Sequence, residues 1–224
     1  MKAVVLLSGG LDSTVCTAVA ASKGFEVFPI SFNYHQRHSI ELASAKKVAA
    51  YYNVNKHLII DTNMNEIGGS ALTDTHIQVP DGEIERATIP VTYVPARNLI
   101  FLSYALGYAE VIGADHIYIG VNAVDYSGYP DCRPDFIRLF QNLADYSTKV
   151  GVEHTRNIHI ETPLMNLTKK DIVLLGNKLK APLHLTHSCY NGGDKACGVC
   201  DSCKLRLKGF AEAGFSDPIE YLSR

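Results

Sequence analysis

A short glycine-rich segment near the N-terminus has the residue types of a phosphate-binding corner. Ser8-Gly9-Gly10-Leu11-Asp12-Ser13 follows an apolar run and precedes an alanine-rich stretch, which predicts a strand, a tight loop and a helix. Two glycines let the backbone turn sharply and approach a ligand, while the first N–H groups of the helix point at the same place. Ser8 and Ser13 could donate hydroxyl groups to phosphate oxygens, and Asp12 could orient amides or hold Mg²⁺. The segment predicts a nucleotide site; the alternative is a glycine turn with a capping Ser or Asp.

Two other nucleotide motifs are absent from the sequence. It contains neither a Walker-type lysine motif nor Gly-x-Gly-x-x-Gly. Their absence argues against a P-loop enzyme that transfers a γ-phosphate and against a dinucleotide-dependent dehydrogenase.

A cysteine cluster near the C-terminus has the spacing of a metal site. Cys189, Cys197, Cys200 and Cys203 could place four thiolates around one tetrahedral ion, with nearby glycines easing the bends. Four thiolates leave no coordination position for water, so we expect a structural zinc ion that activates nothing. An iron–sulfur site and a redox pair that delivers sulfur are the alternatives. Cys16 is expected to be a small buried residue, whereas Cys132 lies in a segment that could bind a ligand.

That segment, residues 120–133, follows a predicted strand at the edge where open α/β sheets bind ligands. Asp125 or Asp131 could accept hydrogen bonds from a purine-like edge, and Tyr126 or Tyr129 could stack on a flat ring. Arg133 could pair with a carboxylate. The alternative is an ordinary turn in which Arg133 leads into a helix that begins at Pro134.

The remaining pattern alternates strands with helices and predicts a parallel α/β sheet. Strands are expected at 2–7, 26–32, 56–60, 116–120 and 158–161, and helices at about 13–23, 39–52, 98–112 and 134–150. Thr168 with Asp171 is typical of a helix N-cap, and another helix should begin near Ser202. Residues 64–95 show no convincing period, so a surface loop is expected there in preference to a mobile lid.

Composition limits the function further. The 224 residues suit one core, 46% of them are hydrophobic, and the formal net charge of −2 gives no overall attraction for a polyanion. The N-terminal apolar run is too short for a signal or membrane segment, so a cytoplasmic protein without a membrane or nucleic-acid partner is expected.

The first loop resembles the PP-loop of N-type ATP pyrophosphatases, which split ATP between its α- and β-phosphates. Along essentially its whole length the chain is similar to the QueC (ExsB) family of the queuosine pathway. The resemblance rests on the first loop and four further segments, namely Tyr34–His38, Val94–Asn98, Gly128–Arg133 and Cys197–Cys203. The family often has glycine at the position of His35, and sometimes at that of Ala96.

The resemblance implies an ATP-dependent C–N ligase that converts 7-carboxy-7-deazaguanine and ammonia to the 7-cyano base. It implies a Rossmann-like domain of the adenine nucleotide alpha hydrolase type over 1–185, a zinc-binding segment over 186–224, Mg²⁺ with ATP, and a homodimer. Substrate contacts are expected from Asp125, Tyr129, Asp131 and Arg133. ATP contacts are expected from Ser8, Gly9, Gly10, Leu11, Asp12, Ser13, Thr14, Val15, Cys16, Thr17, Ala18, Arg97 and Asn98.

The implied chemistry requires two activations, because a carboxylate repels nucleophiles and an amide must lose its oxygen to become a nitrile. No general base is assigned, although His35 or His38 could accept a proton. Arg37 and His38 could equally form a solvated helix entrance with Glu41 as their partner. A PP-loop enzyme that thiolates tRNA and a non-catalytic nucleotide sensor are the competing hypotheses.

Overall fold

The computed structural model describes residues 1–37, 40–82, 88–124 and 128–222. Its described strands form one parallel sheet in the order β3-β2-β1-β4-β5. The strands are β1 (Lys2–Leu6), β2 (Glu26–Asn33), β3 (Leu58–Asp61), β4 (His116–Tyr118) and β5 (His159–Glu161). The α/β class and the parallel sheet expected from the alternating pattern are therefore confirmed.

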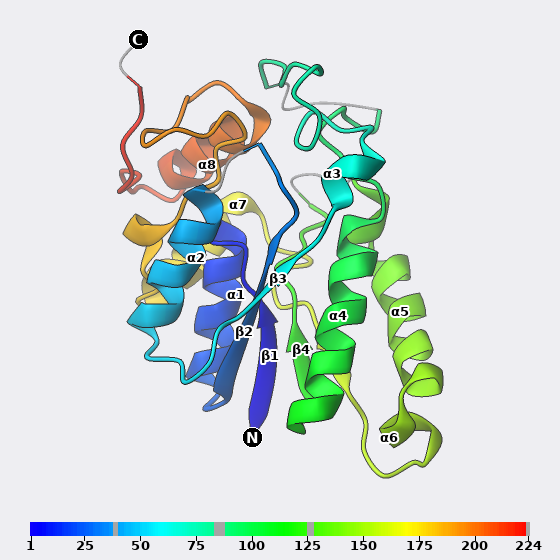
Figure 1. Cartoon of the computed structure of the whole chain (residues 1–224). Coiled ribbons are helices and arrows are strands. Elements are labelled where there is room, and N and C mark those ends of the chain that lie inside the picture. The colour runs from blue at the N-terminus through cyan, green and yellow to red at the C-terminus, as the bar shows by residue number, and fades with distance from the viewer. Residues whose placement is uncertain (38–39, 83–87, 125–127, 223–224) are drawn as a thin grey trace.

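Helices cover both faces of the sheet, as Figure 1 shows. Helices α4 (Arg97–Ile112) and α5 (Pro134–Ser147) lie on one face, and α1 (Leu11–Ser22), α2 (Ile40–Tyr51) and α7 (Lys169–Lys178) lie on the other. Alternation along β1 explains the two layers, because Val4 and Leu6 join the core under α4 while Ala3 and Val5 join the core under α1. Helix α8 (Asp201–Glu212) adds Phe210 to the second core.

Two of the expected elements differ from those observed. The helix expected over 134–150 ends at Ser147, because the Thr148 hydroxyl accepts a hydrogen bond from Gly151 N and begins a separate turn, α6 (Lys149–Val152). Residues 64–95 contain the single turn α3 (Met64–Ile67) and are otherwise without helices or strands where the structure describes them. They are more than a surface loop, since Leu72 and Val94 are buried in the core under α4.

Strand order creates a crevice at the carboxyl end of β1. The chain passes from β1 through α1 to β2 on one side, and later through α4 to β4 on the other side. The loops that follow β1 and β4 therefore diverge at this point, which is where open α/β sheets bind ligands.

No described helix is long and apolar enough to cross a bilayer.

A buried ion pair attaches the end of the chain to α8. The Arg206 guanidinium donates to both carboxylate oxygens of Asp217 at 2.7 and 2.9 Å, and also to the Thr186 hydroxyl at 2.7 Å. The Arg206 and Asp217 side chains are only 2% and 3% exposed. Removing one member of such a pair leaves the other charge buried without compensation.

We predict that Asp217→Ala lowers the free energy of unfolding by about 3–5 kcal/mol. Urea denaturation measures this loss. The control is Glu220→Ala, whose carboxylate pairs with Lys195 at 2.9 Å but is 74% exposed, so its effect should stay within about 1 kcal/mol. Equal losses in the two variants would contradict the argument.

Candidate active site and metal centre

A cavity of about 300 Å³ opens at the carboxyl ends of β1, β2 and β4. Its walls come from elements far apart in the sequence: the loop after β1, the start of α4, the loop after β4 and the segment 188–190. Its volume lies at the lower end of the range for small-molecule sites. Polar lining residues include Ser8, Asp12, Glu41, Arg97, Asn122 and Lys169.

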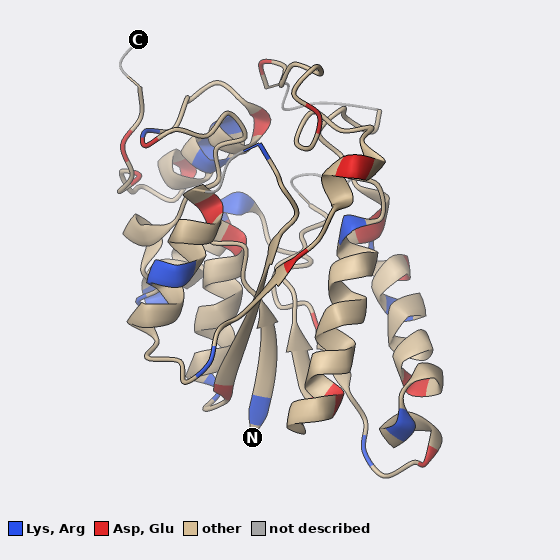
Figure 2. Cartoon of the chain, in the orientation of Figure 1, with Lys and Arg blue, Asp and Glu red and all other residues tan. Residues whose placement is uncertain are grey.

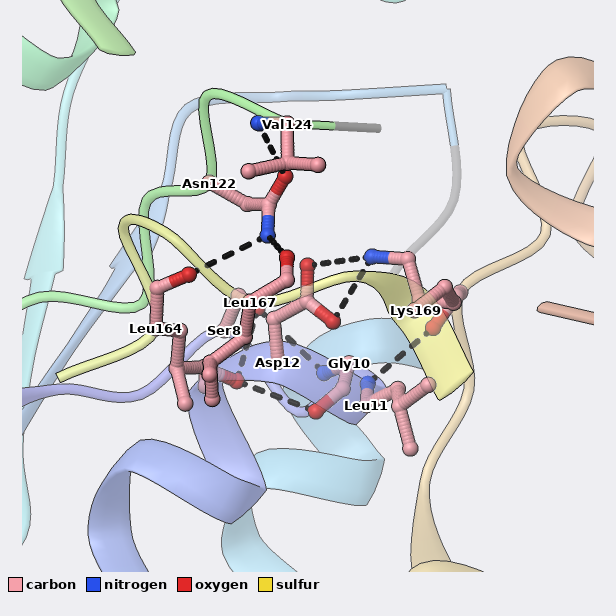
Figure 3. Close-up of polar contacts among 11 residues, drawn as sticks. Ser8, Gly10, Leu11, Asp12, Asn122, Val124, Leu164, Leu167 and Lys169 are labelled. Carbon is pink, nitrogen blue, oxygen red and sulfur yellow. Dashed lines mark hydrogen bonds and ion pairs between the residues drawn. The ribbon is translucent and has the colours of Figure 1, made fainter. Parts of the chain in front are cut away.

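The loop after β1 is held in shape by its own side chains, as Figure 3 shows. The Ser8 and Ser13 hydroxyl groups lie 3.0 Å apart, Gly10 N donates to Ser8 Oγ at 3.3 Å, and Ser13 Oγ donates to Gly10 O at 3.1 Å. From the C-terminal part of the chain, Ser188 Oγ accepts a hydrogen bond from Leu11 N at 3.2 Å. These contacts order the first turn of α1, whose N–H groups suit an anion.

Asp12 forms an ion pair that the sequence did not predict. Lys169 Nζ donates to its two carboxylate oxygens at 2.8 and 2.9 Å. Lys169 is the first residue of α7, which starts with the predicted capping box between Thr168 and Asp171. Hydrogen bonds from Thr168 hold the pKa of the Asp171 carboxyl below its usual value. The sequence predicts only that a helix starts here, so it could not identify the Lys169 ammonium group as a cation beside the loop.

Asn122 holds the loop that leads to Lys169. Its side-chain amide donates to Leu164 O at 3.1 Å and also to Leu167 O, in the loop that leads into α7 (Figure 3). The Lys169 stem lies against Gly209 of α8, where an added Cβ would come within 2.5 Å of Lys169 Cγ. The lysine is therefore positioned by the loop after β4 and by a glycine in the C-terminal helix.

The predicted ATP contacts fall into two groups. Ser8, Gly10, Leu11, Asp12, Ser13, Arg97 and Asn98 line the cavity. Gly9 and the stretch Thr14–Ala18 do not, and all of these side chains beyond Gly9 are buried within α1. Direct nucleotide contacts from these residues stay a prediction.

Arg97 lies among aromatic side chains at the start of α4. It donates to Tyr34 OH at 3.4 Å, and its guanidinium carbon lies 5.9 Å from the centre of the Tyr129 ring. Tyr34, Tyr129 and Tyr190 all line the same cavity. Burial raises the pKa of the Tyr34 hydroxyl, which keeps that group neutral beside the cation.

Of the predicted substrate residues that the structure describes, one lines the cavity and two do not. Tyr129 lines the cavity, and its hydroxyl lies 3.0 Å from Thr92 Oγ1. Asp131 is buried and accepts a hydrogen bond from Asn98 N at 2.8 Å, so it supports the first turn of α4 and is not among the cavity-lining residues. Arg133 is exposed at the start of α5 and does not line the cavity. Asp125, like Tyr126 and His38, lies outside the described residues.

Cys132 lines the cavity but has no features of a reactive thiol. Burial raises its pKa to about 12, and its sulfur accepts a hydrogen bond from Asn98 Nδ2 at 3.2 Å. Cys16 is fully buried, as expected, and burial raises its pKa as well. Neither thiol is poised to become a nucleophile.

The four C-terminal cysteines converge on one point. The sulfur atoms of Cys189, Cys197, Cys200 and Cys203 all lie within 4.8 Å of one another. Backbone N–H groups of Val199 and Cys200 both donate to Cys197 Sγ at 3.4 Å. Hydrogen bonds from Cys200 and Cys203 lower the pKa of Cys189. The contact between Cys189 and Cys200 in turn raises the pKa of Cys200 to about 12. The protons that these thiols share are the ones a bound cation would displace, so the donor set fits a metal ion.

A family model and the named relatives of this chain agree on one family. The family model described as "Queuosine biosynthesis protein QueC" matches residues 2–214. The chain belongs to this QueC family. Proteins named 7-cyano-7-deazaguanine synthase from Desulfitobacterium hafniense and Acetivibrio thermocellus are each 60% identical over all of this chain and over 94% and 99% of their own lengths. Among solved structures, an NMN synthetase from Francisella tularensis is similar at 18% identity and a TM-score of 0.49, over 96% of this chain and 78% of that one.

Two residues of this QueC chain occupy positions where the resemblance suggested that glycine is common. His35 has φ of 52° and Ala96 has φ of 54°, the left-handed region in which a side chain is disfavoured. The backbone therefore explains the preference for glycine, and the two residues accept local strain.

The alternative in which Glu41 is the partner of Arg37 does not hold among the described residues, which do not include His38. Arg37 donates instead to the backbone oxygens of Asp74 and Ile77, at 3.1 and 2.7 Å, and so secures the 64–95 segment.

Glu41 lines the QueC cavity, where burial raises its pKa to about 7 while Arg97 and His187 oppose the shift. A glutamate on the first turn of α2 carries no sequence signal beyond helix charge, so its position in the cavity could not be predicted.

Position 9 has room only for glycine, because the backbone of α2 packs directly against it. It has φ of 92°, and an added Cβ would lie 2.2 Å from Glu41 O and 2.5 Å from Ala45 N. Gly24 has a similar φ of 80°, but an added Cβ there meets nothing within 4 Å.

We predict that Gly24→Ala costs about 1–3 kcal/mol of unfolding free energy through backbone strain alone. Gly9→Ala should cost more, because α2 backbone atoms must also move away. Urea unfolding of the two variants measures the difference. A Gly9→Ala loss no larger than that of Gly24→Ala would contradict this account.

Proposed function

We propose that the chain is a 7-cyano-7-deazaguanine synthase that uses ATP to convert 7-carboxy-7-deazaguanine and ammonia to the nitrile. The names of relatives at 60% identity over the whole chain support this function. The observation that carries it is a single cavity that joins a phosphate-type loop to a cation surrounded by tyrosines. Such a cavity can bring the α-phosphate of ATP to a carboxylate on a flat ring.

The loop after β1 and the first turn of α1 would bind the pyrophosphate part of ATP. Free N–H groups at the helix start and the hydroxyls of Ser8 and Ser13 would stabilise charge as the α–β bond breaks. Lys169 adds a positive charge at the same end of the cavity. Mg²⁺ bound with ATP would supply further charge neutralisation, and Asp12 could hold it through the carboxylate lone pairs that the contact with Lys169 leaves unused.

Arg97 is the cation that we assign to the substrate carboxylate in place of Arg133, because Arg97 lines the cavity and Arg133 does not. Tyr129 and Tyr34 offer ring faces to a deazapurine in the same wall. Adenylation of the carboxylate removes its charge and makes AMP the leaving group, and ammonia then gives the amide. A second adenylation, on the amide oxygen, allows loss of AMP and formation of the nitrile.

The cysteine cluster would hold a structural Zn²⁺ ion. Cys189, Cys200 and Cys203 are at most 2% exposed, and four thiolates fill a tetrahedral coordination shell. The ion would join the 189–203 segment to the cavity wall without taking part in the reaction. The homodimer, the cytoplasmic location and the division at residue 185 stay predictions from the resemblance.

The thiolation hypothesis has little support from the described residues. Cys132, the thiol that lines the cavity, has its pKa raised to about 12 and would stay protonated. Figure 2 shows residues of both charge signs distributed along the chain, and the formal net charge of −2 gives no overall attraction for a polyanion.

We predict that the purified chain releases pyrophosphate from ATP only when 7-carboxy-7-deazaguanine is present, and that ammonium then yields the nitrile with two pyrophosphates per product. A coupled pyrophosphate assay with product detection by mass spectrometry measures both quantities. The matched control is 7-deazaguanine, which lacks the carboxylate. ATP binding without pyrophosphate release would favour a nucleotide sensor.

We predict that the purified chain carries one Zn²⁺ ion and that Cys200→Ser lowers metal affinity by at least about tenfold, since even outer-shell changes have that effect. Plasma mass spectrometry and competition with a chelator measure content and affinity. Cys132→Ser is the control, because it removes a cysteine outside the cluster and should keep the metal. Iron with sulfide in place of zinc would contradict the assignment.

A further inference from the structure

Glu41 lies directly beside the phosphate-type loop. It is in the first turn of α2, and its backbone oxygen would be 2.2 Å from a Cβ added to Gly9. Its side chain lines the cavity together with Ser8 and Arg97. The carboxylate is therefore in the same compartment as the groups that we assign to ATP and to the substrate.

The surroundings of Glu41 leave its carboxylate unpaired. In the described part of the chain it has neither a hydrogen-bond nor an ion-pair partner. The other acidic side chains of the cavity wall are engaged, since Asp12 is bonded to Lys169 and Asp201 has a partner of its own. An unpaired carboxylate in a polar cavity is available to a ligand.

Charged and titratable groups face Glu41 from three other elements. Arg97 of α4 and His187 of the C-terminal segment favour its ionised form, while Cys189 disfavours it. Tyr34, which follows β2, also faces Glu41, and Glu41 contributes to raising the pKa of that tyrosine. Burial is the largest influence and raises its pKa to about 7. A carboxylate with this pKa is partly ionised near neutral pH and can both accept and release a proton.

The proposed function needs a proton acceptor at this place. Ammonia is present near neutral pH mainly as ammonium, which has no lone pair with which to attack a carbonyl carbon. We propose that Glu41 binds the ammonium ion and accepts the proton that frees ammonia for attack on the adenylated carboxylate. This inference rests on the proposed function and adds to it the residue that handles protons.

The step balances in atoms and charge. Ammonium gives one proton to the Glu41 carboxylate, and the nitrogen lone pair of ammonia forms the new C–N bond at the acyl carbon. The C–O bond to AMP breaks, AMP leaves with the electron pair, and the phosphate of the departing AMP takes the second proton from the nitrogen, which gives the neutral amide. Glu41 returns its proton to water between the two adenylations.

The same carboxylate can serve the second half of the reaction. Adenylation of the amide oxygen releases one N–H proton to water and gives an imidate, which must lose its remaining N–H proton as the C–O bond to AMP breaks and the nitrile forms. This proton leaves from the same nitrogen atom in the same cavity, so one acceptor beside that nitrogen is sufficient for both halves.

We test this with Glu41→Gln, which keeps the size of the side chain and removes the acceptor. Single-turnover formation of the amide from ammonium should fall about 10²–10⁴-fold, the usual contribution of a positioned acid or base. Pyrophosphate release on adenylation should stay near the unmodified rate, because that step needs no proton acceptor. Hydroxylamine is largely unprotonated at neutral pH, so it should still capture the adenylate of Glu41→Gln as the hydroxamate.

The matched controls are Glu66→Gln, an exposed glutamate on α3, which should leave all rates unchanged, and Glu41→Asp, which should restore part of the ammonium-dependent rate. In the unmodified chain the single-turnover rate at saturating ammonium should rise with pH through about 7, as Glu41 ionises. Free ammonia also increases with pH but goes on increasing well above pH 7, so a rate that levels off above about pH 7 is the result expected from Glu41, even when Glu41→Gln does not fold.

Several outcomes would overturn the inference. These are equal losses of Glu41→Gln with ammonium and hydroxylamine, loss of adenylation in that variant, or a flat profile between about pH 6 and pH 8. Absence of pyrophosphate release from the unmodified chain would instead remove the proposed function, and this inference with it.

Discussion

The bend at Gly9 is the constraint on which the rest of the site depends. Three parts of the chain meet there: α2 packs so closely that no side chain fits, His187 N donates to Gly9 O at 2.9 Å, and Ser188 Oγ accepts from Leu11 N at 3.2 Å. The loop is therefore shaped by protein contacts before any ligand arrives. Preorganised donors of this kind cost no rearrangement when charge develops on a bound phosphate.

Sequence could predict those parts of the site whose signal is local. The glycine loop after a buried strand, the spacing of the cysteines and the capping box at Thr168 each depend on neighbouring residues, and all three have the expected local structure. The parallel sheet followed from alternating periods, and most element ends agree within two residues. Boundaries differed where a tertiary or capping contact decided them, as at Thr148.

Sequence could not predict the parts that depend on how distant segments pack. Lys169 and Ser188 reach the first loop from more than 150 residues away, and neither stands in a motif. Asp131 and Arg133 belong to a segment that was expected to bind substrate, yet Asp131 supports α4 and Arg133 is exposed and does not line the cavity. Residue type indicated which chemistry was possible, whereas only the fold determined which of these residues line the cavity.

The order of residues 187–190 explains how a metal ion at the cysteine cluster, outside the cavity, would affect the cavity. His187 and Ser188 bond to the first loop, Cys189 is a member of the cysteine cluster, and Tyr190 lines the cavity beside Arg97. Four consecutive residues thus join the loop, the cluster and the cavity wall. A side chain bound to a metal ion loses most of its freedom, and its immediate neighbours lose part of theirs. An ion at the cluster would therefore stabilise the positions of Ser188 and Tyr190, although it contacts neither the nucleotide loop nor the substrate cavity directly.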